Sequence, residues 1–260
     1  MYLIFDTETT GLPKLRDAPI TDVGNWPRCV QIAWQLHDDI GKLIEHQDYL
    51  IKPEGFNIPY DAESIHGIST ELAEADGLPM AEVLDKFNIA LSKSKFIVGH
   101  NLKFDINIMG CEFHRIGIES QMSSMPVLDT CTEVTASLLQ LPRAGGREGK
   151  YKFPTLTELH SYLFNIPFAE VHNATADVEA TTRCFFELIR TEIFTEKELQ
   201  VQGDYFGKFK TQNPSTIQLI GLRHINLKEA SQKRPFRIIS GVSKRNKHVK
   251  KQKKKLQVRS

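Results

Sequence analysis

Two acidic residues, Asp6 and Glu8, stand close together near the start of the sequence. They fall within a short, β-rich run that predicts a strand over Tyr2–Glu8. Because side chains alternate along a strand, both acids project from one face, about 7 Å apart, whereas Phe5 and Thr7 point the other way. Two acids on one face repel each other unless a cation lies between them, and hard cations such as Mg²⁺ or Mn²⁺ prefer oxygen ligands. The pair therefore indicates either a divalent-metal site or a solvated strand edge.

A second group of polar residues follows a short apolar strand predicted over 96–98. The run Gly99–Asp105 leads from the end of that strand into a helix, which is where α/β folds place their ligands. Asp105 is thus another candidate metal ligand. The alternative is structural: Asn101 caps the helix, and Asp105 complements its dipole.

The third group, His172–Asp177, combines a histidine with an aspartate five residues later. On one continuous helix this spacing would put the two side chains about 140° apart. They converge only if His172 lies on the segment that enters the helix and Asp177 lies in its first turns. Asn173 and Thr175 are suitable capping residues for such an entry. A loop histidine beside a first-turn aspartate is the alternative.

The three groups together supply the parts of one hydrolytic site. Asp6, Glu8, Asp105 and Asp177 are enough carboxylates to hold two divalent ions about 4 Å apart. His172 adds a base, because the unperturbed pKa of histidine lies near neutrality and in-line attack by water on a phosphodiester needs a proton acceptor. The combination predicts metal-assisted phosphodiester hydrolysis.

The same residues resemble the three motifs of the DEDDh exonucleases. The likeness lies in Phe5–Gly11, in His100–Asn101 with Phe104–Asp105, and in His172 with Asp177–Thr181. It is strongest to the epsilon proofreading subunit or domain of bacterial DNA polymerase III, and it covers roughly residues 1–190 with motif order and spacing as in that family. Ile65–Ile68 also resembles the segment that lies against the terminal nucleotides in the family.

This resemblance implies a ribonuclease H-like fold and a 3′→5′ exonuclease that removes 5′-mononucleotides from DNA 3′ ends, as a proofreader for a replicative polymerase. It implies two Mg²⁺ or Mn²⁺ ions as cofactors. Asp6, Glu8 and Asp177 would hold the ion that binds the attacking water. Asp6 would bridge to the second ion, supported by Asp105, and His172 would take the proton from the water.

The resemblance also assigns five residues to substrate binding, namely Thr9, Leu12, His66, Asn101 and Phe104. Leu12 and His66 would hold the last base and sugar, with Phe104 packing beneath. The expected substrate is a single-stranded or frayed 3′ end of DNA, and the expected protein partner is a replicative DNA polymerase.

The elements that must position these residues can be predicted from the spacing of apolar residues. Alternating or fully apolar runs predict strands, and stripes with a period of about 3.6 residues predict helices. We expect strands over 2–8, 29–37, 43–51, 96–98 and 126–128, and helices over 63–74, 80–91, 104–116 and 176–189, with two more opened by capping boxes at Thr130–Glu133 and Thr155–Glu158. A three-stranded antiparallel meander followed by alternating strands and helices predicts an α/β fold, with a mixed sheet flanked by helices.

The 260 residues divide into three predicted parts: an exonuclease domain over 1–192, a weakly structured linker or docking segment over 193–240, and a disordered lysine-rich tail over 241–260. The tail carries nine basic residues and no acid, so the net charge of +1 leaves −8 for residues 1–240. An acidic body does not hold nucleic acid by bulk charge, and divalent cations must bring positive charge to the phosphate. The basic loop Arg143–Lys152 either follows the DNA backbone or is merely solvated.

The composition is that of a globular protein of the cytosol. Apolar residues make up 40% of the chain and charged residues 25%, and no apolar run approaches the roughly 18–20 residues that a membrane span needs. The first residues lack the basic region of a signal peptide. The four cysteines, Cys29, Cys111, Cys131 and Cys184, are scattered, which argues against a zinc knuckle or a disulfide framework. We therefore expect a cytoplasmic protein without membrane contact.

Two other functions have to be separated from that of a DNA exonuclease. A 3′→5′ exoribonuclease of the same superfamily shares the metal chemistry and differs in its contacts to the 2′-OH, so cleavage of matched DNA and RNA strands separates the two. A non-catalytic docking module has no need for all five candidate catalytic residues, and this chain has them all.

Overall fold

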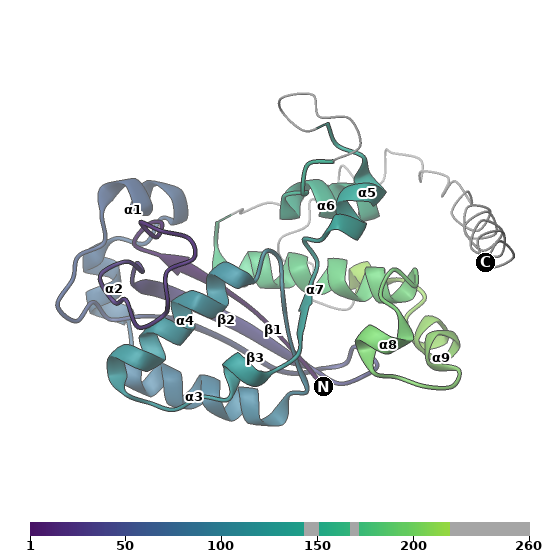
Figure 1. Cartoon of the computed structure of the whole chain (residues 1–260), viewed down its shortest axis with the longest axis horizontal. Coiled ribbons are helices and arrows are strands. Elements are labelled where there is room, and N and C mark those ends of the chain that lie inside the picture. Colours follow the sequence, from purple (N-terminus) through teal and green to yellow (C-terminus); the bar gives the residue numbers. More distant parts are fainter. Residues whose placement is uncertain (143–150, 167–171, 219–260) are drawn as a thin grey trace, which may run out of the picture.

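The fold is built around a mixed sheet. The computed structural model describes residues 1–142, 151–166 and 172–218, and within them five strands form a sheet of order β3-β2-β1-β4-β5 (Figure 1). β1, β2 and β3 pair antiparallel, whereas β4 pairs parallel with β1 and β5 pairs parallel with β4. The strands are β1 Tyr2–Thr9, β2 Cys29–His37, β3 Leu43–Leu50, β4 Phe96–Gly99 and β5 Val127–Asp129. The predicted meander with added parallel strands is confirmed.

The central strand β1 is buried on both faces. Leu3 and Phe5 pack into a core on one side of the sheet, which we call the first core, and Tyr2 and Ile4 pack into a second core on the other side. A strand covered on both faces reads as a continuous apolar run, as β1 does before its first acid. Because Asp6 continues the face of Tyr2 and Ile4, the alternation directs it toward the side of the second core.

Helices cover both faces of the sheet (Figure 1). α3 and α4 contribute to the first core, and α6 to α9 contribute to the second. In the described ranges the helices are α1 Tyr60–His66, α2 Thr70–Asp76, α3 Met80–Lys93, α4 Lys103–Ile116, α5 Glu133–Leu139, α6 Leu156–Phe164, α7 Ala174–Arg190, α8 Glu196–Leu199 and α9 Tyr205–Gln212, with 3-10 turns η1 Met122–Ser124 and η2 Thr216–Gln218. The capping box predicted at Thr155–Glu158 opens α6. None of the described helices combines the length and the apolar character that crossing a bilayer requires.

One predicted helix is in fact two. Instead of a single helix over 63–74, α1 and α2 are separated at Gly67, whose φ of 75° ends α1 in the left-handed region. Glycine tolerates this conformation because it lacks a Cβ. Ser69 then caps α2 by accepting a hydrogen bond from Leu72 N at 3.1 Å.

The capping box predicted at Thr130–Glu133 is wrong. The N-cap of α5 is Thr132, which forms its box with Thr135. Thr130 is fully buried instead, and its hydroxyl lies 2.9 Å from His100 Nδ1. The Thr130 side chain, which the local pattern assigned to the start of the helix, therefore makes a tertiary contact with His100 instead.

The second core extends past the predicted domain boundary. Phe194 and Phe209 are buried there, and the Phe209 ring stacks on Phe186 of α7 with centroids 5.9 Å apart. Residues 193–218, which we expected to be weakly structured, form α8, α9 and η2. The rest of the predicted linker and the lysine-rich tail, 219–260, lie outside the described residues. The position of the boundary stays a prediction.

Replacing Phe209 by alanine is expected to destabilise the domain by about 3–5 kcal/mol, because it removes a buried aromatic side chain from the second core. Urea unfolding followed by circular dichroism measures the free energy of unfolding. Tyr60→Ala is the control, since Tyr60 is 78% exposed on α1, and its effect should stay within about 0.5 kcal/mol. An effect of Phe209→Ala as small as that of the control would contradict the packing of α9 on α7.

Candidate active site

One cleft of about 670 Å³ contains all five residues that the sequence singled out for catalysis. It lies at the carboxyl end of β1, and its lining comes from β1, α4, the entry to α7 and the segment that leads into α6. The five residues are Asp6, Glu8, Asp105, His172 and Asp177. The fold thus brings together acids from three distant stretches of the chain.

His172 and Asp177 converge because the chain turns sharply before α7. Ligand atoms of Glu8, His172 and Asp177 lie within 4.8 Å of one another. His172 adopts a φ of 68°, and its backbone N–H donates to Asp177 Oδ2 at 3.1 Å. Asn173 is the N-cap of α7 and accepts a hydrogen bond from Ala176 N at 3.3 Å. His172 therefore lies on the entry segment and Asp177 in the first turn, as convergence requires.

Asp105 approaches β1 from the opposite side of the sheet. It is buried in the first turn of α4, and its Oδ1 accepts hydrogen bonds from Thr7 N at 3.1 Å and Thr7 Oγ1 at 2.6 Å. Strand alternation turns Thr7 away from Asp6 and Glu8, so Thr7 can anchor the acid that arrives from the other face. No role was predicted for Thr7, although its place between the two acids was a usable signal.

Asp129 holds the backbone that leads into α4. Its carboxylate accepts hydrogen bonds from the N–H groups of Asn101, Leu102 and Cys131, at 2.9, 2.9 and 2.7 Å. Asn101 has a φ of 61°, so these bonds stabilise a left-handed residue directly before α4. Asp129 thereby positions the helix that carries Asp105.

Gln31 fixes the start of α7 beside the acids. It is buried on β2, where it pairs with Glu8 of β1. Its Nε2 donates to Asp48 Oδ1 at 2.9 Å, and its Oε1 accepts from Ala174 N at 3.2 Å. Thr175 Oγ1 also donates to Asp48. The first residues of α7 are therefore bonded to both β2 and β3, which holds this end of the helix over β1.

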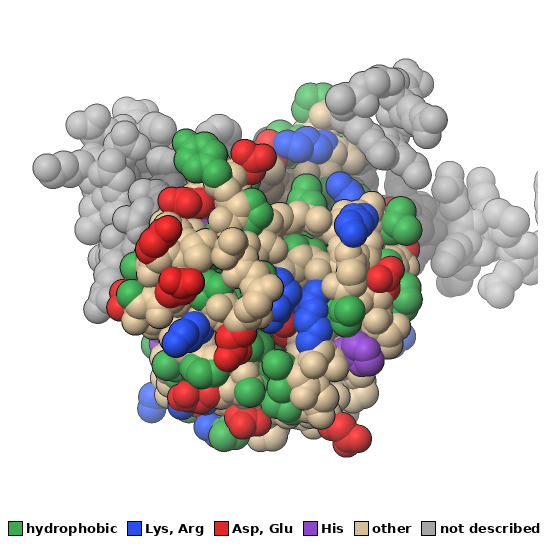
Figure 2. Space-filling view, turned by 90° about the vertical axis from the view of Figure 1, so that its left-hand side faces the viewer, with side chains coloured by type: hydrophobic (Ala, Val, Ile, Leu, Met, Phe, Trp, Pro, Cys, Tyr) green, Lys and Arg blue, Asp and Glu red, His purple; other side chains and the backbone are tan. Residues whose placement is uncertain are grey.

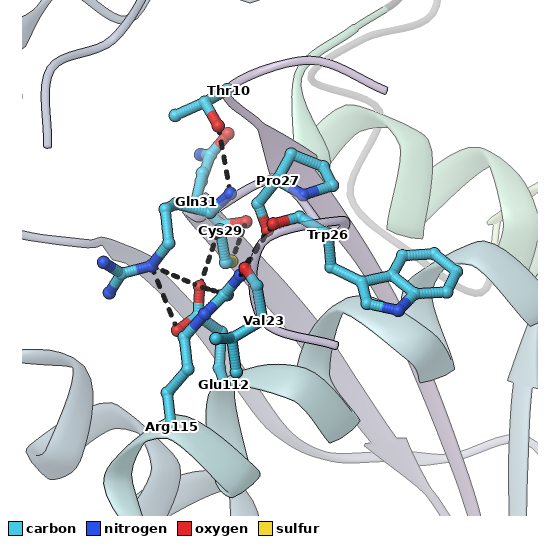
Figure 3. A network of polar contacts seen from close by, with 9 residues as sticks. Thr10, Val23, Trp26, Pro27, Cys29, Gln31, Glu112 and Arg115 are labelled. Atoms are coloured by element: carbon cyan, nitrogen blue, oxygen red, sulfur yellow. Dashed lines mark hydrogen bonds and ion pairs between the residues drawn. The ribbon is translucent and has the colours of Figure 1, made fainter. Parts of the chain in front are cut away.

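A second buried network holds the turn after β1 (Figure 3). Glu112 of α4 is fully buried and accepts hydrogen bonds from Arg28 Nε and Arg115 Nη1, each at 2.9 Å, and from Cys29 N at 3.0 Å. Arg115 also donates to backbone carbonyls of the loop before β2, and Thr10 pairs with the backbone of Arg28. This buried acid is fully compensated by cations, so the network ties α4 to β2 as a structural unit.

The cleft, in contrast, carries uncompensated negative charge. Among the described residues that line it, none is Lys or Arg. Burial, followed by the charges of Asp177 and Asp105, raises the pKa of Glu8 to about 8. Burial also raises the pKa of Asp105 to about 7 and that of Asp177 to about 6, although hydrogen bonds to each carboxylate oppose the shift. The pKa of Asp6 is raised well above its usual value by burial and by the other three carboxylates.

This donor set fits hard divalent cations. Carboxylate oxygens are the ligands that Mg²⁺ and Mn²⁺ prefer, and acids that repel one another are stabilised by a cation between them. His100 also lines the cleft, but its Nε2 lies 3.0 Å from Pro154 O and its Nδ1 2.9 Å from Thr130 Oγ1, so both ring nitrogens are already engaged.

Figure 2 shows acidic, basic and apolar side chains intermingled on the face that carries α1 and α2, so this face does not attract a polyanion by a field of one sign.

Two of the residues assigned to substrate binding, Asn101 and Phe104, line the cleft. Thr9 and Leu12 do not. Thr9 Oγ1 donates to Gly11 O at 2.7 Å within the turn after β1, and Leu12 is 81% exposed on the same turn. The binding roles of these residues stay predictions.

His66, the third residue outside the cleft lining, closes α1. It is buried, and its Nδ1 accepts a hydrogen bond from Ile68 N at 3.1 Å. Burial lowers the pKa of His66, the Thr9 backbone partly opposes this, and the nearby His172 lowers it further. His66 is therefore a neutral side chain close to the edge of the site, and its contact with the substrate stays a prediction.

One wall of the cleft lies outside the three sequence motifs. It consists of Phe153, Pro154, Thr155 and Leu156, with Cys131 nearby. The local pattern correctly predicted a helix start here, but it does not indicate what the helix start faces. An aromatic residue directly after the glycine-rich, polar sequence 143–152 was the available signal for this wall.

In the absence of divalent ions, the acids of the cleft should make stability fall as pH rises. The folded-state pKa values of Glu8, about 8, and Asp105, about 7, exceed unfolded values near 4, so the folded protein binds more protons than the unfolded chain between about pH 4 and 8. Burial lowers the pKa of His37 and His160 to about 4, which acts in the opposite direction below about pH 6.5. The range from about pH 6.5 to 8 therefore isolates the effect of the acids.

Glu8→Gln is expected to flatten this decrease and to raise the free energy of unfolding at pH 8 in EDTA, because it removes one of the repelling charges. Urea unfolding at several pH values measures the slope. Glu54→Gln, at an exposed position, should leave the slope unchanged. The same slope in Glu8→Gln and in the wild type would contradict a repulsive cluster.

Known proteins resemble this chain in sequence. The 3′-5′ exonuclease DinG of Bacillus subtilis is 31% identical over 189 residues, which cover 72% of this chain and 17% of that protein. The PolC-type DNA polymerase III of Lactococcus lactis is 28% identical over 186 residues, which cover 71% of this chain and 10% of that protein. The chain therefore spans only a minor part of the length of these relatives.

Among solved structures, E. coli exonuclease I in complex with a dT13 oligonucleotide has a TM-score of 0.57 at 24% identity, over 73% of this chain and 41% of that chain. This likeness supports the α/β fold described above. Residues 3–185 match the family described as Exonuclease, RNase_T. The match confirms the resemblance found in the sequence, and this chain belongs to the RNase_T family of exonucleases.

Proposed function

We propose that this chain is a divalent-metal-dependent 3′→5′ exonuclease that releases 5′-mononucleotides from the 3′ ends of DNA. The observation that carries the proposal is one cleft whose lining includes all four candidate carboxylates and His172, with no basic side chain among its described residues. Membership of the exonuclease family supports the type of reaction.

Two Mg²⁺ or Mn²⁺ ions are the cofactors that this donor set suits. When bound, they would supply positive charge to the reacting phosphate and the departing 3′ oxygen and lower the pKa of a bound water. We assign Asp6, Glu8 and Asp177 to the ion beside His172, and Asp105 to the second. Asp6 is the acid whose pKa is raised by all three of the others, which suits a residue shared between two ions.

His172 is the proposed proton acceptor for the attacking water. Its side chain is exposed, and its nearest ring nitrogen lies within 4.8 Å of carboxylate oxygens of Glu8 and Asp177. The hydrogen bond from its own backbone to Asp177 fixes the turn that carries the imidazole. The proposed proton acceptor and Asp177 are thereby held together by a single short segment.

DNA is the proposed substrate class. Its support is that the solved exonuclease I was crystallised with a dT13 oligonucleotide and that the PolC-type relatives are DNA polymerases. The alternative is an exoribonuclease with the same metal chemistry. With 5′-labelled single strands of matched sequence and Mg²⁺, DNA should be shortened faster than RNA; faster shortening of RNA would favour the alternative.

We further propose that the enzyme proofreads for a replicative DNA polymerase. The support comes from the PolC-type relatives, of which this chain spans only about a tenth, so the polymerase is a proposed partner. A mismatched primer–template should be digested faster than a matched one, and the replicative polymerase should co-purify at micromolar concentration. Equal digestion of both substrates without co-purification would exclude the proofreading role and leave the nuclease proposal intact.

Asp6→Asn and Asp177→Asn are each expected to lower exonuclease turnover by more than about 100-fold, because each removes a proposed metal ligand. A 5′-labelled oligonucleotide in Mg²⁺ measures the rate, and EDTA should abolish wild-type cleavage. Asp85→Asn, at an exposed position on α3, should retain full activity. Substantial Mg²⁺-dependent activity in either site variant, with native circular dichroism, would count against the assignment.

His172→Asn is expected to lower kcat by about 10²–10⁴-fold, because it removes the general base while asparagine tolerates the left-handed φ of 68°. Comparison with His172→Ala separates the loss of the imidazole from backbone strain. Activity of the asparagine variant should recover in part at higher pH, where hydroxide replaces the lost base. A pH–rate profile identical to that of the wild type would remove His172 from this role.

A further inference from the structure

Phe153 is a large aromatic residue on the wall of the cleft that faces no core. Its side chain is 50% exposed, whereas the next residue, Pro154, is buried. Packing in the interior therefore does not account for the position of this ring. Exposed aromatic residues in a cleft are typical of ligand contacts.

The backbone on both sides of Phe153 is held in place. On one side, Lys152 N donates to Leu141 O at 3.0 Å. On the other side, Thr155 and Glu158 form the capping box of α6, with Thr155 N donating to the Glu158 carboxylate at 2.8 Å. The ring therefore projects from a pinned segment, and little conformational freedom of the backbone is lost when a ligand binds there.

His100 ties this segment to the acidic side of the cleft. A carbonyl only accepts, so His100 Nε2 donates to Pro154 O at 3.0 Å, while Nδ1 lies 2.9 Å from the Thr130 hydroxyl, which also contacts Gly99 O at 3.1 Å. Burial lowers the pKa of His100, which favours the neutral imidazole. The wall that carries Phe153 is thus bonded directly to the residue that precedes Asn101 at the entry to α4.

The described side chains of the cleft supply no positive charge for binding nucleic acid. None of its described lining residues is basic, and the nearby Lys152 ammonium is bonded to Glu158 Oε1 at 2.7 Å. An exposed aromatic ring supplies affinity without charge, since every nucleobase has a π-face on which it can stack. Stacking is also tolerant of base sequence, as an enzyme that removes successive nucleotides requires.

We propose that Phe153 is a substrate-binding residue whose ring stacks on a nucleobase of the single-stranded end held in the cleft. The inference rests on the proposed nuclease function and extends it to a residue outside the three sequence motifs. It assigns the binding of the bases to the wall that carries Phe153, and the binding of the phosphate through cations to the acids of the cleft.

Steady-state cleavage of single-stranded oligonucleotides in Mg²⁺ tests the proposal. Phe153→Ala is expected to raise KM by roughly 5- to 150-fold, with kcat within about twofold of the wild type. Phe153→Trp should retain the wild-type KM, and Phe153→Leu, which keeps apolar surface without a π-system, should restore it only in part. Tyr162→Ala is the matched control, because Tyr162 is also 50% exposed but lies on α6 outside the cleft lining, and its KM should not change.

A binding readout separates stacking from a structural effect. Oligonucleotides with 2-aminopurine at successive positions are mixed with enzyme in Ca²⁺, which takes the same oxygen ligands. Wild type should quench the fluorescence at one or two positions, Phe153→Ala should lose this quenching, and Tyr162→Ala should keep it. Thermal unfolding of every variant checks that the fold is retained.

The possible outcomes distinguish this inference from the proposed function. A wild-type protein that neither cleaves nor binds DNA overturns both. If the wild type cleaves and Phe153→Ala matches it in KM and quenching, only the stacking role is overturned. If Phe153→Leu equals the wild type in both measurements, the contact is apolar packing, and stacking is likewise overturned.

Discussion

The structure depends on holding mutually repelling carboxylates at one place. Acids from β1, α4 and α7 share a single cleft, and burial raises the pKa of each. Repulsion by the neighbouring acids raises the pKa values of Asp6 and Glu8 further. In a flexible chain these acids would move apart and relieve their repulsion. The fold therefore has to hold them together. A sheet covered on both faces can do so, because strands and helices packed in two cores resist displacement.

The acids of the cleft are anchored by neutral donors. Thr7 N–H and hydroxyl hold Asp105, and the backbone N–H of His172 holds Asp177. Neutral donors fix a carboxylate without cancelling its charge, whereas a neighbouring arginine would compete with a bound cation. Glu112 differs from these acids, since Arg28 and Arg115 compensate its negative charge in a network that ties α4 to β2. The neutral partners of Asp105 and Asp177 thus leave negative charge in the cleft, whereas the charge of Glu112 is compensated.

The features that could be predicted from the sequence are those that depend on local pattern. Alternation along β1 predicted the common face of Asp6 and Glu8, and capping residues predicted the entry that brings His172 to Asp177. Tertiary hydrogen bonds leave no local pattern, so the bond between Gln31 and the start of α7 could not be predicted, nor could the use of Thr130 to hold His100. Asp105 was predicted as a candidate ligand from its place after an apolar strand, but its convergence with the other acids depends on the pairing of β4 with β1, which local pattern does not determine.

A hydrogen bond joins the aromatic wall of the cleft to the segment between β4 and α4 and thereby limits changes in the width of the cleft. His100 follows β4 directly, and its ring bonds to the carbonyl of Pro154 just before α6, so one side chain spans from the acidic wall to the aromatic wall. Because Asp129 bonds the next two residues as well, the backbone between β4 and α4 is held from two directions. Under the proposed function, a cleft held in this way would need little rearrangement to accept a strand of nucleic acid, and the binding energy of a base at the aromatic wall would help to position the phosphate at the acids.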